Sequence, residues 1–577
     1  MSLDRLLVLL LFLLAGTAAS AATADANLVV RSPDGRNAIG LTFDASNRPA
    51  YFVRRDEELV ILPSPVLLQL ADGPLGSGSR SLGAERRSVD QNWRRVAGRS
   101  SLVRDHFNEL RVHLVDDRQR RFDLILRAYD DGVALRTFVP VQQGIGTAIA
   151  AEETGFYLAG NYRCWGFNVG RFGTGHEGEF DPVQARHVRE HNLYDVPLLC
   201  ETGKGALLIT EADLLDYPAM YLKGRGDGGL GLVSKLSPSL ADPAIAAEIS
   251  PGKPVQTPWR VVMLAGKAGE LAASNLVDNL ATPSRIEDTG WIRPGKASSD
   301  WLSGGWIDGG PVAVSSTRSI RALIDFAAQN GLEYVMVDDG WYQGSGVAPG
   351  FDPKANIFAD APGFNLKEAV AHARRRGVSL WVWLDWRALD PVMDRALQYL
   401  AAQGIAGINV DFMDRDDQEM VRWYEKLLDA ARRNRLMVEM HGAFVPRGLA
   451  RTYPNFLTQE GVLGSEYNKW SSRITAGHNV MLAYTRGVLG PMDYIPGSFI
   501  NVSPEQFKPR YVLPMAQTSR AHNLSMFLVY DSPWASLADS PDIYRNSPAG
   551  FDFVREVPTH WDETRFIAGE VGEYIAL

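Results

Sequence analysis

The sequence predicts a multidomain protein with an N-terminal antiparallel β-sandwich, a central (β/α)8 TIM barrel and the start of a C-terminal β domain. Three observations predict this fold class. The chain has 577 residues, which is more than one domain usually holds. Its first half consists of short strand-like runs and turns without a sustained helical period. Residues 284–555 then alternate between strand-like and helix-like segments, over roughly the 250 residues of such a barrel.

Residues 1–21 have the pattern of a secretory signal peptide. Arg5 precedes an apolar run from Leu6 to Leu14, and the small residues 19–21 fit a cleavage site. The run is too short to span a membrane as a mature helix, and no later stretch has eighteen apolar residues in a row. An uncleaved anchor is the alternative. We expect a periplasmic or secreted protein with no membrane span in the mature chain.

Composition excludes one class of partner. The net charge is −9, with acidic and basic residues mixed along the chain, so there is no basic footprint for nucleic acid. The 14 Trp and 19 Tyr residues are of types that often line sugar sites, although such rings also fill cores. Cys164 and Cys200 are the only cysteines. They could pair in an oxidising compartment, but they have no zinc-site spacing.

Residues 22–283 are expected to form the sandwich. In SPDGRNAIGLTF, Asp34-Gly35 marks a turn between two strands. Residues 110–140 alternate apolar and polar side chains and turn at an Asp-Asp-Gly sequence. This alternation has the period of half-buried strands, and it predicts a large antiparallel super-sandwich.

Residues 284–555 are expected to form the barrel, with the first strand near 303–308. The helix at 316–331 is the clearest, because Ser and Thr precede its apolar period and Gly ends it. The expected order continues with strand 332–342, helix 365–377, strand 378–386, helix 390–404, strand 405–414, helix 417–435, and strands 436–443, 454–461 and 479–490, then helix 503–523 and strand 524–530.

Acidic residues recur where these strands end: Asp338, Asp339, Asp385, Asp411, Glu460 and, on a following loop, Glu466. Barrel chemistry takes place at the C-terminal ends of the strands. Two carboxylates on separate strands suit glycoside hydrolysis, in which one attacks the anomeric carbon or activates water and the other protonates the leaving oxygen. Asp411 directly ends an apolar strand, although a strand-end cap is the alternative. Asp414, Asp416 and Asp417 are expected to cap the helix at Gln418.

Long motifs spread over the chain carry a resemblance to a known family. They are SPDG, YDDGVALR, TEADLLDYP, WIRPGKAS, VDDGWY, VDFMDRDDQ, HGAFVPRGLARTYPN, EGVLGSEYNKW and GPMDYIPG. On these motifs the chain resembles glycoside hydrolase family 97. The resemblance implies a sandwich, a (β/α)8 barrel and a small C-terminal β domain, with Ca²⁺ in the active site.

The resemblance also implies catalytic roles. Inverting α-glucosidases of the family carry a base Glu directly after a strand-end His, but here Gly442 follows His441. Retaining α-galactosidases use an Asp nucleophile that corresponds to Asp411, and their acid/base corresponds to Glu466. The carboxyl groups of a retaining pair lie roughly 5–5.5 Å apart. We therefore expect a retaining α-galactosidase acting on an α-galactoside or oligosaccharide.

The expected calcium ligands are Glu460, Glu466 and a residue of the sandwich domain. The resemblance places Glu460 among the metal ligands, and Glu466 could touch the metal as well. Glu190 is the candidate from the sandwich, with His191 and Asn192 as its rivals. Glu460 could instead be a structural loop acid. A hard cation with several oxygen ligands would gather acidic side chains that otherwise repel one another.

Five further residues are candidates for substrate binding: Asp338, Asp339, Trp341, Trp386 and His441. The two aspartates either bind sugar hydroxyls or bond only within the barrel mouth. The two tryptophans either stack on sugar or pack, and His441 is either a substrate contact or a hydrogen-bonded wall residue.

Two rival functions remain open. The first is an inverting α-glucosidase of the same family, against which Gly442 argues. The second is a non-catalytic sugar-binding protein on this scaffold, against which Asp411 and Glu466 argue. Other sugars of galactose-like configuration, such as β-L-arabinopyranosides, are alternative substrates. The oligomeric state cannot be read from the sequence.

Residues 556–577 are expected to begin an incomplete β domain. Val571, Tyr574 and Ile575 are typical of a strand, but so few residues cannot build an independent sheet. We expect the chain from about Trp561 to pack against the outside of the barrel or to be poorly ordered, and the natural product to be longer.

Overall fold

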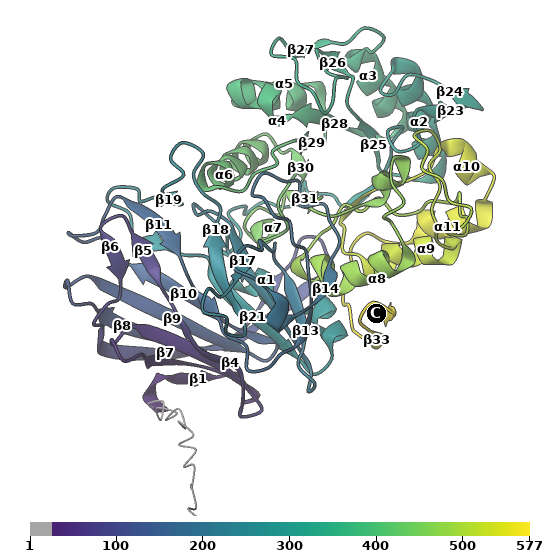
Figure 1. Cartoon of the computed structure of the whole chain (residues 1–577). Helices are drawn as coiled ribbons and strands as arrows, with labels where there is room; N and C mark the ends of the chain where they lie inside the picture. Colours follow the sequence, from purple (N-terminus) through teal and green to yellow (C-terminus); the bar gives the residue numbers. More distant parts are fainter. Residues whose placement is uncertain (1–25) are drawn as a thin grey trace, which may run out of the picture.

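The computed structural model describes residues 26–577, and the expected signal peptide at 1–21 lies outside these residues. Figure 1 shows a sheet-rich N-terminal part packed against a barrel built from the second half of the chain. The predicted fold class is therefore confirmed in its main lines. Between residues 26 and 577, no helix combines the length and the apolar character needed to cross a bilayer.

The N-terminal part is centred on a large, predominantly antiparallel sheet with the path β14-β13-β15-β16-β21-β10-β9-β8-β7. Its strands are β14 (Asp181–Gln184), β13 (Arg163–Gly166), β15 (Leu198–Glu201), β16 (Ala206–Ala212), β21 (Trp259–Ala265), β10 (Gly132–Val139), β9 (Arg121–Tyr129), β8 (Leu102–Val115), β7 (Arg80–Arg94) and, paired with β10, β20 (Val255–Gln256).

Three smaller sheets complete the sandwich. They are β1 (Val29–Arg31), β2 (Asn37–Phe43), β3 (Pro49–Arg55) and β4 (Glu58–Pro65); β19 (Ala247–Glu248), β11 (Ala148–Glu152), β5 (Leu68–Leu70) and β6 (Gly73–Leu75); and β12 (Gly155–Phe156), β18 (Leu232–Leu236) and β17 (Met220–Gly224). A disulfide joins Cys164 on β13 to Cys200 on β15, which are direct cross-strand partners.

The central strands of the large sheet are buried on both faces. Every residue of β16 and β21 is buried. Leu207 and Ile209 face one hydrophobic core with the smaller sheets, whereas Leu208 belongs to a second core. That second core also contains barrel-side residues such as Val462 and Leu482. Because successive side chains alternate between faces, the sheet serves as the core of the sandwich and as the wall on which the barrel rests.

The barrel has seven parallel strands in the order β31-β30-β29-β28-β25-β22-β32. They are β22 (Gly295–Ser298), β25 (Tyr334–Val337), β28 (Ser379–Asp385), β29 (Gly407–Asp411), β30 (Met437–Met440), β31 (Phe456–Gln459) and β32 (Trp534–Ser536). The helices around them are α2 (Thr317–Asn330), α3 (Leu366–Arg376), α4 (Trp386–Leu389), α5 (Met393–Gln403), α6 (Gln418–Arg433), α7 (Leu449–Thr452), α8 (Ala476–Tyr484), α9 (Arg520–Val529), α10 (Pro541–Arg545) and α11 (Pro548–Glu556).

The expected first strand near 303–308 was wrong. The first barrel strand is Gly295–Ser298, while Trp306–Ile307 forms a small hairpin with Gly310–Pro311. The sequence GKAS hides this strand because it carries a lysine at a buried position. The Lys296 ammonium donates hydrogen bonds to main-chain carbonyls at the end of α11, so its burial is compensated.

The last part of the barrel also differs from expectation. Residues 479–490 and 524–530 are mostly helical, in α8 and α9, because a short apolar run does not distinguish a strand from a buried helix. The expected helix at 503–523 is mostly irregular until α9 begins. Between β31 and β32 lies an irregular segment around Met492, in which Met492 N donates to Asp531 O and Asp493 N donates to Gln459 O.

Helix ends follow the sequence signals closely. The Ser316 side chain accepts a hydrogen bond from Ser319 N at the start of α2, and Gly331 ends this helix with a left-handed φ of 71°. Asp417 caps α6 by accepting from the next backbone amides, as predicted. Asp414 and Asp416 do not cap this helix, which corrects the expectation. The fully buried Asp416 instead contacts the sandwich through Tyr221.

The last residues form a two-stranded hairpin of β33 (Ala568–Glu570) and β34 (Tyr574–Ala576) rather than a lone strand. Tyr484 of α8 donates a hydrogen bond to Tyr574 O. Trp561 N also donates to Gly98 O, at the turn between β7 and β8. The segment from Trp561 therefore packs against both the sandwich and the barrel, and not against the barrel alone.

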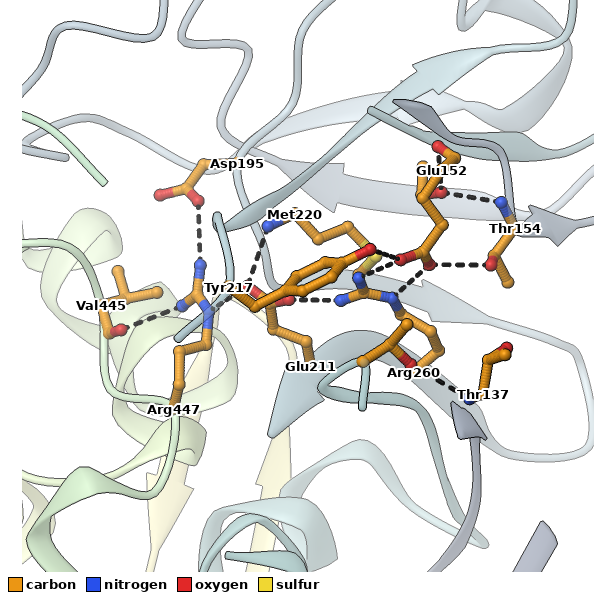
Figure 2. Close-up of polar contacts among 12 residues, drawn as sticks. Thr137, Glu152, Thr154, Asp195, Glu211, Tyr217, Met220, Arg260, Val445 and Arg447 are labelled. Carbon is orange, nitrogen blue, oxygen red and sulfur yellow. Dashed lines mark hydrogen bonds and ion pairs between the residues drawn. The ribbon is translucent and has the colours of Figure 1, made fainter. Parts of the chain in front are cut away.

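A chain of buried ion pairs runs from the sandwich core to the barrel (Figure 2). Arg260 on β21 lies between Glu152 and Glu211, and its Nε–Oε1 distance to Glu152 is 2.6 Å. Glu211 also accepts from Arg447 Nε at 2.9 Å, and Arg447 Nη2 lies 3.6 Å from Asp195 Oδ1. Arg447 belongs to the loop after β30, so these pairs tie that barrel loop to acids of the sandwich.

We predict that Arg260→Leu lowers the free energy of unfolding by about 3–5 kcal/mol, because it leaves buried Glu152 without its cation and Glu211 with Arg447 alone. The matched control is Arg31→Leu, which removes the exposed pair with Glu57 and is expected to cost less than about 1 kcal/mol. Thermal and urea unfolding of the purified chains measure both values. Equal effects of the two substitutions would contradict the role given to the buried pairs.

Candidate active site

Asp411 is the last residue of β29 and lies at the mouth of the barrel. Its Oδ2 accepts a hydrogen bond from Trp383 Nε1 at 3.1 Å, and its Oδ1 accepts from Phe412 N at 2.5 Å. Removal from bulk water raises the pKa of Asp411 to about 6. Trp383 stands two residues before Asp385, the last residue of β28. Side chains two apart on a strand share a face, so the sequence could have placed Trp383 on the same face as Asp385.

The turn after Asp411 closes the position where an inverting base would stand. Phe412 has a φ of 67° and Gly442 has a φ of 52°, both in the left-handed region. A Cβ atom on Gly442 would lie 2.9 Å from Phe412 N, the same amide that donates to Asp411. A side chain at position 442 would therefore displace the backbone that orients Asp411.

Glu466 lies on the short 3₁₀ helix Ser465–Lys469 and is half-buried. Its Oε2 accepts a hydrogen bond from Trp301 Nε1 at 3.1 Å. The Lys469 ammonium lies over the Trp301 ring and donates to Trp301 O at 2.7 Å, while burial lowers the pKa of Lys469 to about 8. Each candidate catalytic carboxylate thus accepts one indole N–H. Trp301 was missed because it lies in an irregular loop without a sequence signal.

Glu460 and Glu466 form a group with Glu177, a residue that the sequence did not single out. One carboxylate oxygen from each residue lies within 4.8 Å of the others. Glu460 Oε2 accepts from Gly442 N at 3.0 Å. Burial and then the charge of Glu466 raise the pKa of Glu177 to about 8, and burial and Glu177 raise that of Glu460 well above its usual range. Hard oxygen donors that repel one another fit a divalent cation such as calcium.

Glu190 does not belong to this group, and its expected metal role was wrong. Its carboxylate is exposed and lies 3.7 Å from Lys223 Nζ. His191 is also exposed, and the Asn192 side chain accepts a hydrogen bond from the backbone of Arg189. The sandwich instead reaches the barrel mouth with the loop between β13 and β14, which carries Glu177. This loop has neither strand nor helix period, so its place could not be read locally.

Asp338 and His441 stand near the catalytic candidates. Burial raises the pKa of Asp338 to about 7, and the His441 charge opposes this shift. His441 Nε2 lies 2.9 Å from Asp493 Oδ2 and 3.4 Å from Glu439 Oε1. Burial lowers the pKa of His441, but the charge of Glu460 and the bond with Asp493 outweigh it, and the pKa is raised well above its usual value. Because neighbouring carboxylates stabilise its protonated form, His441 can present positive charge to the cleft.

The other three substrate-binding candidates have different positions. Asp339 accepts hydrogen bonds from Gly346 N and Ala348 N, so its carboxylate organises its own loop. Trp341 is fully buried and donates from Nε1 to Trp383 O at 2.7 Å. Of the two roles left open for Trp341, the structure shows packing behind Trp383, so Trp341 is removed from the substrate-binding candidates. Trp386 is half-buried and meets the Trp423 ring edge-on, with ring centroids 5.8 Å apart.

A parallel barrel with two separately held carboxylates at its C-terminal mouth has the site architecture of a glycoside hydrolase. The comparisons with known proteins are specific. The family model described as Glycosyl-hydrolase 97 N-terminal matches residues 30–283, and the model described as Glycoside hydrolase 97 matches residues 304–462. The chain belongs to glycoside hydrolase family 97, which confirms the resemblance found in the sequence.

Similar curated proteins include a retaining alpha-galactosidase of Bacteroides thetaiotaomicron. It is 31% identical over 590 residues, covering 96% of this chain and 85% of that protein. A probable retaining alpha-galactosidase of Streptomyces bingchenggensis is 33% identical over 532 residues, covering 91% of this chain and 77% of that protein.

Two solved structures have the same fold. A family 97 enzyme of Pseudoalteromonas sp. strain K8, in complex with acarbose, has a TM-score of 0.86 at 25% identity and covers 95% of this chain and 86% of its own. A beta-arabinopyranosidase has a TM-score of 0.80 at 23% identity, with coverage of 95% and 88%. The second likeness concerns the fold alone.

We predict that Trp383→Phe lowers kcat/KM by about 10–100-fold, because a hydrogen bond to a charged group contributes about 1.5–3 kcal/mol. Phe keeps an aromatic ring at this buried position but is smaller than Trp, so the free energy of unfolding of each variant is measured alongside its rate. Trp423→Phe is the matched control, since it removes an indole bond to Asp390 on the outside of the barrel. Steady-state kinetics of both variants on an aryl α-galactoside test this, and equal losses would contradict it.

Proposed function

We propose that this chain is an exported, calcium-dependent, retaining exo-glycosidase that hydrolyses terminal α-galactosides by double displacement. One observation carries the retaining mechanism: Gly442 is sterically closed by the Phe412 turn, while the same turn orients Asp411. The printed names of the relatives in Bacteroides and Streptomyces support the sugar and the stereochemistry.

In this proposal Asp411 attacks C1 of the galactoside and forms a covalent glycosyl-enzyme. Glu466 donates its proton to the glycosidic oxygen as the C1–O bond breaks. In the second step Glu466 removes a proton from water, the water oxygen bonds to C1, and the bond to Asp411 breaks. Because C1 is inverted twice, the product keeps its α configuration.

The proposed cation would be held by Glu177, Glu460 and Glu466. When bound, Ca²⁺ would supply positive charge that offsets the mutual repulsion of these carboxylates and binds sugar hydroxyls. The chain itself holds Glu460 through Gly442 N and brings Glu177 from the sandwich. His441 and Asp338 are the chain's own groups for contacting the sugar.

Two observations bear on the rival functions and on export. An inverting α-glucosidase needs a second base, and its position is closed here. A non-catalytic binder has no need for two carboxylates that each accept an indole N–H. The Cys164–Cys200 disulfide supports export to a periplasm or beyond, because such bonds persist in oxidising compartments.

We predict that Asp411→Ala loses several orders of magnitude in rate and that azide restores turnover of an activated aryl α-galactoside. The small anion would occupy the face that Asp411 leaves, so the expected product is the β-galactosyl azide, identified by NMR. Glu466→Ala should retain much of its glycosylation rate on good leaving groups, which need little protonation. Identical behaviour of the two variants, or a β-sugar as first product of the wild type, would overturn the proposed roles.

We predict that exhaustive chelation removes most of the activity and that Ca²⁺ restores it. Without a cation, burial and then the neighbouring like charges raise the pKa values of Glu177 and Glu460, which favours protonation of the group. Initial rates after dialysis against chelator and after titration with Ca²⁺ or Mg²⁺ measure the effect. Activity that is indifferent to chelation would contradict a calcium-dependent mechanism.

A further inference from the structure

The loop that carries Glu177 connects β13 to β14 and crosses from the sandwich to the barrel mouth. A long irregular loop does not by itself hold a carboxylate at a defined point. Here Thr174 N donates to Asp414 O at 2.9 Å, in the segment that follows Asp411. Gly175 leaves room for the Glu177 carboxylate, because a Cβ there would collide with it. The loop therefore docks on the segment that begins at the catalytic candidate.

His176, the residue before Glu177, contacts an acid of each domain. It is 2% exposed and has a φ of 60°, a left-handed conformation that few non-glycine residues adopt. Its Nδ1 lies 2.7 Å from Asp195 Oδ2, on the sandwich, and its Nε2 lies 3.5 Å from Asp416 Oδ2, on the barrel. The two ring nitrogens thus face one buried acid of each domain.

Both acids are themselves anchored. Asp416 Oδ2 accepts from the Tyr221 hydroxyl at 2.7 Å, and the Tyr221 ring stacks on His176 with centroids 6.1 Å apart. Asp195 is close to Arg447 of the barrel, at 3.6 Å. The contacts of His176 are therefore buried and have fixed partners, unlike a mobile ion pair at the surface. The position of the His176 backbone is set by one acid of the sandwich and one acid of the barrel.

We propose that His176 is a positioning residue that bridges Asp195 and Asp416 and thereby sets Glu177 as the sandwich domain's ligand in the cation site. This inference rests on the proposed calcium site and adds the group that assembles it. Because Glu177 directly follows His176, a shift of the bridge moves the point from which the carboxylate extends. Groups that orient metal ligands are worth about 10–100-fold in metal affinity.

The test is Ca²⁺ binding by titration calorimetry on the purified full chain after removal of divalent ions. His176→Gln should weaken Ca²⁺ binding by about 10–100-fold, and Glu177→Gln should weaken it at least as much. His187→Gln is the matched control, because His187 is an exposed histidine of the same domain, and its affinity should equal that of the wild type. His176→Asn serves as a second variant if His176→Gln does not fold.

The double variant separates positioning from general stability. If His176 acts through Glu177, then His176→Gln should add less than about twofold to the loss already caused by Glu177→Gln. A lowered melting temperature alone does not produce this coupling. Wild-type affinity in His176→Gln, or losses that multiply in the double variant, would overturn the proposal for His176.

Other outcomes concern different parts of the argument. If the wild-type chain binds no Ca²⁺, the cation site and the role of His176 both fail. If it binds Ca²⁺ and the coupling is found, but no α-galactoside is hydrolysed, then the proposed substrate fails while the role of His176 stands.

Discussion

Charged side chains without access to water must find partners, and this constraint governs the contact between the sandwich and the barrel. Arg260 forms ion pairs with Glu152 and Glu211, and Glu211 also forms an ion pair with Arg447 of the barrel. Burial of each group is tolerated only because the next one is present. The two domains are consequently joined by interactions whose geometry admits little variation. The loops at the barrel mouth that take part in these interactions are therefore held in defined positions.

The same removal from water creates the chemistry of the site. Asp411 is oriented by an indole and a backbone amide, while three other carboxylates stand close enough to repel one another. Three carboxylates this close repel one another when all are ionised, and binding of protons or of a cation reduces this repulsion. A cleft arranged in this way can hold one carboxylate ready for attack and another ready to share a proton.

Local patterns revealed most of the barrel and one part of the site. Asp411, Glu460 and Glu466 were found because they follow apolar strands, whose ends meet at one mouth. Glu177 was not found, because its loop reaches the mouth only through contacts between domains. Trp341 shows a second limit, because its residue type fitted both a sugar platform and packing, and only the fold, which buries it completely, decides for packing.

The barrel strands that escaped prediction share a physical cause. Gly295–Ser298 carries a lysine whose burial is compensated by distant carbonyls, and these carbonyls cannot be inferred from nearby residues. Between β31 and β32, the segment around Met492 makes two backbone hydrogen bonds without forming a regular strand. Tertiary contacts therefore decided these elements more than propensity did.

The large sheet of the sandwich, buried on both faces, has a consequence for biosynthesis. Domains emerge from the ribosome in order, with the N-terminal one first. The face that carries Leu208 and Met263 would remain uncovered until the barrel, whose strands extend from Gly295 to Ser536, has been made and folded. During that interval the nascent sandwich presents an apolar surface of the kind that chaperones recognise. Yield on expression of this chain is therefore expected to depend on how quickly translation completes the barrel.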